Sequence, residues 1–350
     1  MIKGEIINGY TILEDFKVAG GMSKVSFASK NGKEYFIKEF LYPKYPTPES
    51  PGSEAIKKKK KKACEEFEKH HREINNKIGS KVSIGGNLVF AVDFFRCGAS
   101  YYKINEKIDT STLACSAISE LPEEKILIIA KSVCHSIRIL HNLNIVHGDL
   151  KPDNILIKKT AAGYSGKLID FDDSYFSGNP PEDRECVVGT PEYYSPEQAD
   201  YIMDEDEEIS GKTLTCKSDI FTLGVILSEY FTGEKPITIK GPVWAAIKHG
   251  EPVRFAKCLN EKLKSLIISM LSLNPTERPS IDQVFETLRL LHTEPPTSTE
   301  SKTTTPAIGL RGGILKGGFA PTHTEDTPSI AESPMAIGLR GKGLDIAKKK

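Results

Sequence analysis

Four polar residues in the middle of the chain carry groups that could perform phosphoryl transfer. Asp149, Lys151 and Asn154 lie within six residues of one another, and Asp170 follows sixteen residues after Asn154. A short return of the chain would bring these two carboxylates, the ammonium and the amide together. Phosphoryl transfer from a magnesium nucleotide needs oxygen ligands for the metal, a carboxylate near the attacking hydroxyl, and cations over the phosphates.

The segment His147–Asn154 (HGDLKPDN) resembles the catalytic loop of eukaryotic-type (Hanks-type) Ser/Thr protein kinases, and more closely that of bacterial or archaeal members than that of animal ones. The resemblance implies ATP and Mg²⁺ as cofactors, with Mn²⁺ as an alternative metal. It makes Asp149 the catalytic base and places Lys151 on the γ-phosphate. Asn154 and Asp170, the latter opening an Asp-Phe-Asp triplet, are the implied metal ligands.

Three downstream motifs follow in the order that this family shows. Gly189–Glu197 resembles the substrate-facing loop, and Asp219 stands at the start of the family's buried helix. Arg278 is the implied salt-bridge partner of Glu197.

The N-terminal part supplies the implied nucleotide-binding residues. The segment Val18–Val25 resembles the glycine-rich phosphate loop, although Val18 and Ser23 replace its outer glycines. Lys38 is the implied α/β-phosphate lysine and counts among the catalytic residues. Phe36 stands where the family usually has a small alanine over the adenine. The loop residues expected to contact the cofactor are Val18, Gly20, Gly21 and Val25.

Two further assignments follow from the resemblance. A helix glutamate is expected to pair with Lys38, and the local motif favours Glu73. Glu68 stays an alternative, because the apolar helix positions do not place Glu73 squarely on their face. The hinge that contacts the nucleotide is predicted at Glu106 to Ile108, which makes Asn105 the polar gatekeeper residue.

Two departures from the family pattern bear on regulation. Gly148 replaces the arginine that clamps a phosphorylated activation loop in many kinases, which indicates an enzyme that needs no such clamp. Asp172 replaces the glycine of the Asp-Phe-Gly motif and adds a negative charge near the metal. Neither change removes a reactive group.

The pattern of elements predicts an α+β, bilobal protein-kinase-like fold. A small strand-rich lobe (10–108) is followed by a larger helical lobe (109–292), after a leader at 1–9. Residues 293–350 contain nine threonines, four serines and two copies of AIGLRG, and they are expected to form a disordered tail. The six lysines at 57–62 are expected in an exposed, mobile loop before a helix at 63–78.

Composition narrows the function class. Lysine plus arginine and aspartate plus glutamate both number 47, which excludes a globally basic nucleic-acid binder. Seven cysteines without a pairing pattern, and no apolar run long enough to span a membrane, favour a cytoplasmic protein.

A protein Ser/Thr kinase that also phosphorylates itself is the leading hypothesis, with proteins as substrates and a phosphothreonine-reading partner for the tail. The alternatives are a pseudokinase or phospho-dependent scaffold with weak turnover, and a small-molecule kinase of related fold.

Overall fold

The structure, a computed structural model, describes residues 2–19, 23–83, 86–161, 163–181, 184, 187, 189–204 and 208–293. The chain divides into two units, Met1–Glu294 and Pro295–Lys350, and the second lies outside the described residues. The predictions for the threonine-rich tail and its repeats therefore concern residues beyond the described part. Its expected first residue, Thr293, is the last residue of a helix.

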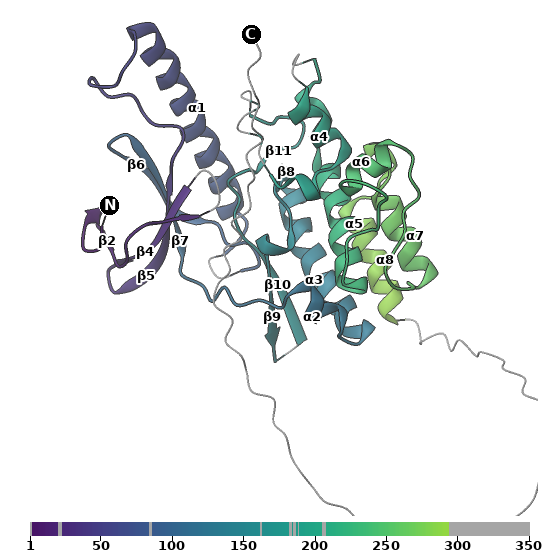
Figure 1. Cartoon of the computed structure of the whole chain (residues 1–350). Coiled ribbons are helices and arrows are strands. Elements are labelled where there is room, and N and C mark those ends of the chain that lie inside the picture. The colour runs from purple at the N-terminus through teal and green to yellow at the C-terminus, as the bar shows by residue number, and fades with distance from the viewer. Residues whose placement is uncertain are drawn as a thin grey trace, which may run out of the picture. The chain divides into compact units, whose positions relative to one another are not determined.

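An antiparallel sheet forms the N-terminal part (Figure 1). Its strand order is β1-β2-β4-β5-β7-β6, and β3 pairs with β4 at the side. The last strand of this order begins at Ala91, and Leu88 before it forms an isolated bridge with Leu168 of another sheet. The strands are β1 (Ile6–Ile7), β2 (Tyr10–Ile12), β3 (Lys17–Ala19), β4 (Ser23–Lys30), β5 (Lys33–Phe40), β6 (Ala91–Cys97) and β7 (Ser100–Glu106).

The two faces of this sheet differ in chemistry. Ala28, Ile37 and Ile104 are fully buried in an apolar cluster on one face. Because side chains alternate along a strand, their neighbours Lys38 and Lys103 point to the other face, where these two residues lie opposite each other on β5 and β7. The sheet thereby presents two lysines side by side on the face away from its apolar cluster.

Helix α1 (Glu54–Gly79) is longer than the sequence predicted, and the expected loop at 57–62 is wrong. The lysines are helical because Ser53 caps the helix, Glu54 occupies its first turn, and lysine is a good helix former. Lys61–Glu65 and Lys62–Glu66 ion pairs one turn apart, at 3.8 and 3.3 Å, support the helix. In Figure 1 the N-terminal turns of α1 extend past the strands.

The C-terminal part is mainly helical and surrounds α5 (Cys216–Thr232), in which every residue from Ser218 to Thr232 is buried. The prediction of a helical lobe after the strand-rich part is confirmed. The other helices are α2 (Cys115–Ser119), α3 (Glu123–Asn142), α4 (Pro196–Met203), α6 (Val243–Lys248), α7 (Glu261–Met270) and α8 (Ile281–Thr293).

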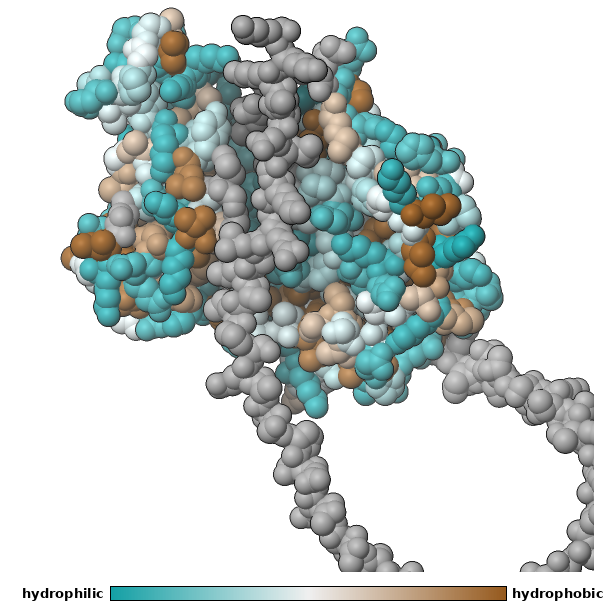
Figure 2. Space-filling model, viewed as in Figure 1, coloured by the Kyte–Doolittle hydropathy of each residue, from teal (hydrophilic) through white to brown (hydrophobic). Residues whose placement is uncertain are grey.

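Two small antiparallel sheets complete this part. The hairpin of β9 (Ile155–Thr160) and β10 (Gly163–Leu168) packs against α3, and β8 (Ile145–Val146) pairs with β11 (Tyr175–Phe176). The face in Figure 2 is mostly hydrophilic, with apolar residues in small separate groups. In the described part of the chain, no helix combines the length and the apolar character needed to cross a membrane.

Candidate active site

The loop after β8 is held in place by the buried helix α5. The Asp219 carboxylate accepts hydrogen bonds from the backbone amides of His147, at 2.8 Å, and Gly148, at 3.4 Å. The His141 ring nitrogen lies 2.9 Å from the same carboxylate. A side chain from the core of the helical part therefore fixes the backbone that precedes Asp149.

Asp149 is the centre of a hydrogen-bonded cluster. Its Oδ2 lies 2.6 Å from the Lys151 ammonium, and the Asn154 amide donates to the Asp149 carbonyl oxygen at 2.7 Å and to Oδ2 at 3.1 Å. Thr190 donates its hydroxyl to Asp149 Oδ1 at 2.8 Å and accepts from Lys151 at 2.7 Å. The structure thus brings the three predicted residues of this loop together and adds Thr190. The sequence contained that signal, because Thr190 lies in the segment that resembles a substrate-facing loop.

The β9–β10 hairpin is the chain return that carries Asp170 back to this loop. The Ile169 amide donates to the Asn154 carbonyl at 3.0 Å, and the His147 ring nitrogen lies 3.1 Å from the Ile169 carbonyl. Asp170 has a φ of +60°, a conformation that costs energy for a residue other than glycine and is frequent at functional sites. Its side chain is 40% exposed, so the carboxylate is accessible.

Lys38 extends from β5 to two carboxylates. Its ammonium lies 3.0 Å from Asp170 and 2.5 Å from Asp172. Burial alone would lower the pKa of Lys38, but Asp172 and Asp170 outweigh burial and raise the pKa above its ordinary value. Lys38 is therefore a charged group next to the Asp170 carboxylate.

The predicted pairing of Lys38 with a helix glutamate is wrong in this structure. The Glu73 side chain is 52% exposed and lies 3.9 Å from Lys69, while the alternative, Glu68, pairs with Arg72 at 2.9 Å. The helix face that packs inward carries Cys64, His71, Ile74 and Ile78. Glu73 follows His71 by two residues, or about 200° around the helix axis, and so points away from Lys38.

The position next to Lys38 is occupied instead by Asp172 and a second lysine. The Lys103 ammonium lies 2.5 Å from Asp172 Oδ1, and both side chains are largely buried. Sequence reasoning missed Lys103, although a lysine between Tyr102 and Ile104 in a buried strand is a signal: a buried lysine requires a partner.

The residues predicted to surround the nucleotide lie on or near the sheet. Val18 on β3 is 62% exposed, and Val25 pairs with Lys38 across β4 and β5. Glu106 ends β7, and Ile108 is half-buried in the connection that follows. Gly20 and Gly21 lie outside the described residues.

Two further residues predicted near the nucleotide are Phe36 and Asn105, which pair across β5 and β7. The Phe36 ring packs edge-on against Phe27, with ring centroids 6.1 Å apart. The amide of Asn105, the predicted gatekeeper, donates to the Val89 carbonyl at 3.3 Å.

The donor set of Asn154 and Asp170 fits a hard divalent cation. The Asn154 amide nitrogen is committed to Asp149, which leaves its amide oxygen as the donor. Asp170 adds an accessible carboxylate. One carboxylate and one amide oxygen, completed by phosphate oxygens and water, form a set typical of Mg²⁺ in nucleotide sites.

Gly148 has a steric reason to be glycine. Its φ is +83°, and a Cβ at this position would lie 2.1 Å from the Asp173 carbonyl oxygen. The arginine that many family members carry here would not fit this backbone. The close approach of the segment after Asp170 therefore explains this departure from the family motif.

Glu197 and Arg278 form the expected ion pair. Arg278 donates from two nitrogens to the two Glu197 oxygens at 2.7 and 2.8 Å, and its side chain is fully buried. Ser218 of α5 also donates to Glu197, at 2.8 Å. The pair joins the start of α4 to the segment before α8.

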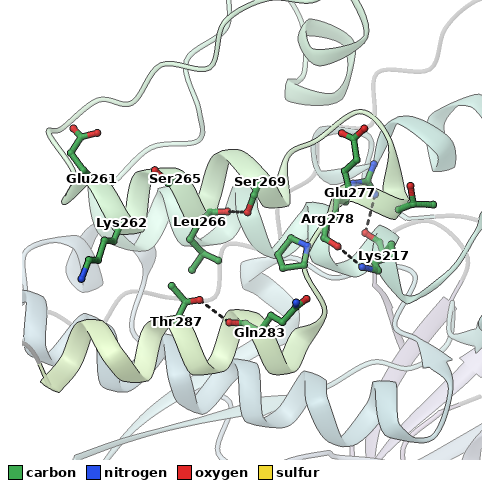
Figure 3. Close-up of a pocket in the computed structure, with 12 residues that line it drawn as sticks. Lys217, Glu261, Lys262, Ser265, Leu266, Ser269, Glu277, Arg278, Gln283 and Thr287 are labelled. Atoms are coloured by element: carbon green, nitrogen blue, oxygen red, sulfur yellow. Dashed lines mark hydrogen bonds between the residues drawn. The ribbon is translucent and has the colours of Figure 1, made fainter.

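A wide groove of about 810 Å³ lies between α7 and α8, apart from this cluster (Figure 3). None of the predicted catalytic or cofactor-binding residues lines it. Several of its polar groups are used locally: Lys217 donates to the Arg278 carbonyl, and Thr287 donates to the Gln283 carbonyl at 2.8 Å. The lining is Lys217, Glu261, Lys262, Ser265, Leu266, Ser269, Thr276, Glu277, Arg278, Pro279, Gln283 and Thr287.

Comparison with known proteins identifies the fold and its relatives. The protein kinase domain family matches residues 51–288, which begin after the strand that carries Lys38. Serine/threonine-protein kinase PknB of Mycobacterium tuberculosis (strain ATCC 25618 / H37Rv) is 30% identical over 262 residues, covering 70% of this chain and 40% of the relative. PknA of Corynebacterium glutamicum is 34% identical over 161 residues, covering 45% and 32%. PksC of Streptomyces coelicolor is 28% identical over 225 residues, covering 59% and 38%. Each match spans less than half of the relative's length.

Proposed function

Because this chain belongs to the protein kinase domain family, we propose that it transfers the γ-phosphoryl group of ATP to serine or threonine hydroxyls of protein substrates. The observation that carries the proposal is the cluster in which Lys151, Asn154 and Thr190 hold the two oxygens of Asp149. Relatives named serine/threonine-protein kinases support the same substrate class.

In this proposal Asp149 orients the substrate hydroxyl and accepts its proton as the new O–P bond forms and ADP leaves. Each carboxylate oxygen has two acceptor sites, so Oδ1 can accept from a substrate hydroxyl while it accepts from Thr190. Lys151 lies 2.6 Å from Asp149, where its charge can stabilise the transferred phosphoryl group. Lys38 holds the α- and β-phosphates.

Asn154 and Asp170 are the proposed ligands of Mg²⁺, with Mn²⁺ as an alternative. When bound, the metal neutralises phosphate charge and aligns the phosphoryl group. The protein contributes the two oxygen donors. The hydrogen bond from the Asn154 amide nitrogen to the Asp149 carbonyl leaves the Asn154 amide oxygen as a donor. The left-handed backbone conformation of Asp170 favours presentation of its carboxylate.

The nucleotide is proposed to lie under the sheet, between the phosphate loop and the connection after β7. Val25 supports this placement, because it neighbours Lys38 on the same sheet face. The residues proposed to contact the nucleotide are Val18, Gly20, Gly21, Val25, Glu106 and Ile108.

The wider proposal includes a kinase unit at about 10–292, a cytoplasmic location, and autophosphorylation of the tail as a way to recruit a phosphothreonine-binding partner. The absence of pairing spacings among the cysteines supports the location. The abundance of threonine after residue 293 supports the recruitment.

Labelled ATP, magnesium and a generic protein substrate test the activity. The wild type should incorporate label into serine or threonine, and Asp149→Asn should lower kcat about 10²- to 10⁴-fold, the typical contribution of a general base. The variant's affinity for ATP should change little, because Asp149 acts on the hydroxyl.

Three outcomes would contradict parts of this proposal. Equal label in wild type and variant would remove Asp149 from catalysis. ATP binding without transfer by the wild type would favour the kinase-shaped scaffold, and label on a small molecule alone would favour a small-molecule kinase.

A further inference from the structure

Asp172 lies between two lysines of the sheet. Its Oδ2 is 2.5 Å from Lys38 and its Oδ1 is 2.5 Å from Lys103, so each oxygen has its own cation. The side chain is only 13% exposed. Burial opposes ionisation of Asp172, but Lys103 and Lys38 outweigh burial and hold its pKa well below the ordinary value. The residue is therefore a buried carboxylate anchored at both oxygens.

With a metal ion on Asp170, Asp172 would be the carboxylate that stays paired with Lys38. Lys38 also contacts Asp170, but Asp170 is the proposed metal ligand, and a carboxylate bound to a cation is a weaker partner for an ammonium. Of the two carboxylates that contact Lys38, only Asp172 is then left to restrain the ammonium. Lys103 keeps the group of Lys38, Lys103 and Asp172 at a net charge of +1, which suits a polyphosphate neighbour.

Helix α1 contributes no carboxylate to this group. The residue that faces it is His71, which is buried against Phe40, Phe67 and Phe94. Burial lowers the pKa of His71 to about 3, so the ring is neutral at physiological pH. The contact between α1 and the segment of Asp172 is of another kind: the His70 ring nitrogen lies 2.8 Å from the Ser174 carbonyl.

We propose that Asp172 is the positioning residue that holds Lys38 at the phosphate site, in place of a helix glutamate, and that Lys103 anchors Asp172. The inference rests on the proposed function. It gives a role to two unusual residues of the site, Asp172 in the place of a glycine and Lys103 in a buried strand.

Charge removal without a change of shape tests the proposal. Asp172→Asn should lower kcat/KM for ATP about 10- to 100-fold, through a higher KM for ATP and a lower kcat, because an interaction with a charged group is lost and Lys38 is misplaced. The KM for the protein substrate should stay unchanged. Glu73→Gln, which removes the exposed helix carboxylate, should behave like the wild type.

A second pair of variants separates positioning from folding. Asp172→Asn leaves Lys103 buried without a counterion, so Asp172→Asn/Lys103→Met should regain thermal stability while its affinity for MgATP stays low. His71→Glu added to this double variant places a carboxylate on the inward face of α1 and should recover at least about tenfold in affinity, the effect of a single charged hydrogen bond.

Four results would overturn the proposal: wild-type ATP kinetics in Asp172→Asn, recovery of ATP affinity in the double variant, no recovery in the folded triple variant, or a loss in Glu73→Gln. MgATP affinity is measured directly by calorimetry in every variant. A wild type that binds MgATP without transferring phosphate would count against the proposed function, and the affinities would still decide the role of Asp172.

Discussion

At residue 148 the backbone leaves no room for a side chain. The φ of Gly148 is +83°, and the nearest atom to a Cβ would be a backbone oxygen, which cannot turn aside as the end of a flexible side chain can. Gly98, in the turn between β6 and β7, also has a positive φ, +60°, but it faces open space. A substitution of Gly98 therefore tests conformational strain alone, whereas a substitution of Gly148 tests strain together with steric overlap.

Gly148→Ala is expected to lower the free energy of unfolding by about 2–4 kcal/mol, because backbone strain and overpacking add. Gly98→Ala should cost only about 1 kcal/mol, the strain of the left-handed conformation alone. Urea unfolding measures both. Equal losses in the two variants would show that the Asp173 carbonyl moves away at little cost.

Asp173 is a carboxylic acid with an unusual pKa. Burial, and then the charges of Asp149, Asp172 and Asp170, raise its pKa from 3.8 to about 7, and Lys38 offsets only part of this. Between pH 3.8 and about pH 7, the Asp173 carboxyl keeps its proton in the folded protein and releases it in the unfolded chain. The stabilisation from this group is therefore complete below the unfolded pKa and is lost as the pH rises through the folded pKa.

The pH dependence of unfolding in the absence of metal and nucleotide tests this. From about pH 5 to about pH 8, the wild type should lose stability relative to Asp173→Asn, whose amide does not titrate. Urea midpoints at several pH values give the difference, and the other titrating groups are common to both proteins. Parallel curves would mean that the Asp173 carboxyl ionises normally in the folded state.

At the scale of a secondary-structure element, the two ends of helix α1 are stabilised by different interactions. Its buried residues begin at Cys64, whereas the exposed lysines before it rely on helix propensity, the Ser53 cap and ion pairs along the surface. The N-terminal turns should therefore unfold locally at little cost to the rest of the molecule.

Lys59→Pro is expected to remove helical hydrogen-exchange protection around the lysine run, because proline costs about 3 kcal/mol inside a helix. The urea midpoint should change little, since this part of α1 buries little apolar surface. Lys59→Ala is the matched control and should keep the protection. If the wild type shows no protection at residues 57–62, the lysine run forms a loop and not a helix.

At the scale of the whole compact unit Met1–Glu294, the Glu197–Arg278 pair connects segments that are far apart in the sequence. Arg278 also donates to backbone carbonyls of Lys217, Ser272 and Leu273. Removing the arginine would leave a buried carboxylate without its cation. The arrangement therefore ties α4, α5 and the segment before α8 together.

Arg278→Met should destabilise the protein by about 3–5 kcal/mol, the cost of breaking a buried ion pair. Arg289→Met is the control, because its pair with Glu286 is half exposed and solvent-exposed ion pairs contribute little to stability. Thermal or urea unfolding measures both variants. Similar losses would show that burial of the Glu197 pair carries no special cost.

Much of the architecture was readable from local patterns. The long helices α3, α5, α7 and α8 carry apolar residues at helical spacing, and Asp149, Lys151 and Asn154 are neighbours in one loop, so short-range geometry brings them together. The hairpin that returns Asp170 was anticipated as a chain return but not as two strands, because short apolar runs do not separate strand from helix. The start of α1 was missed because a lysine run lacks an apolar periodicity.

The partner of Lys38 depended on packing between distant segments. Glu73 lies in the matching stretch of sequence, but the inward face of α1 is set by Cys64, His71 and Ile74, and so Glu73 turns to solvent. Lys38, Lys103 and Asp172 are brought together by strand pairing and by the hairpin, across separations of 65 to 134 residues. A buried charge is stable only beside its counter-charge, and a linear pattern records the types of these residues but not the contact that satisfies them.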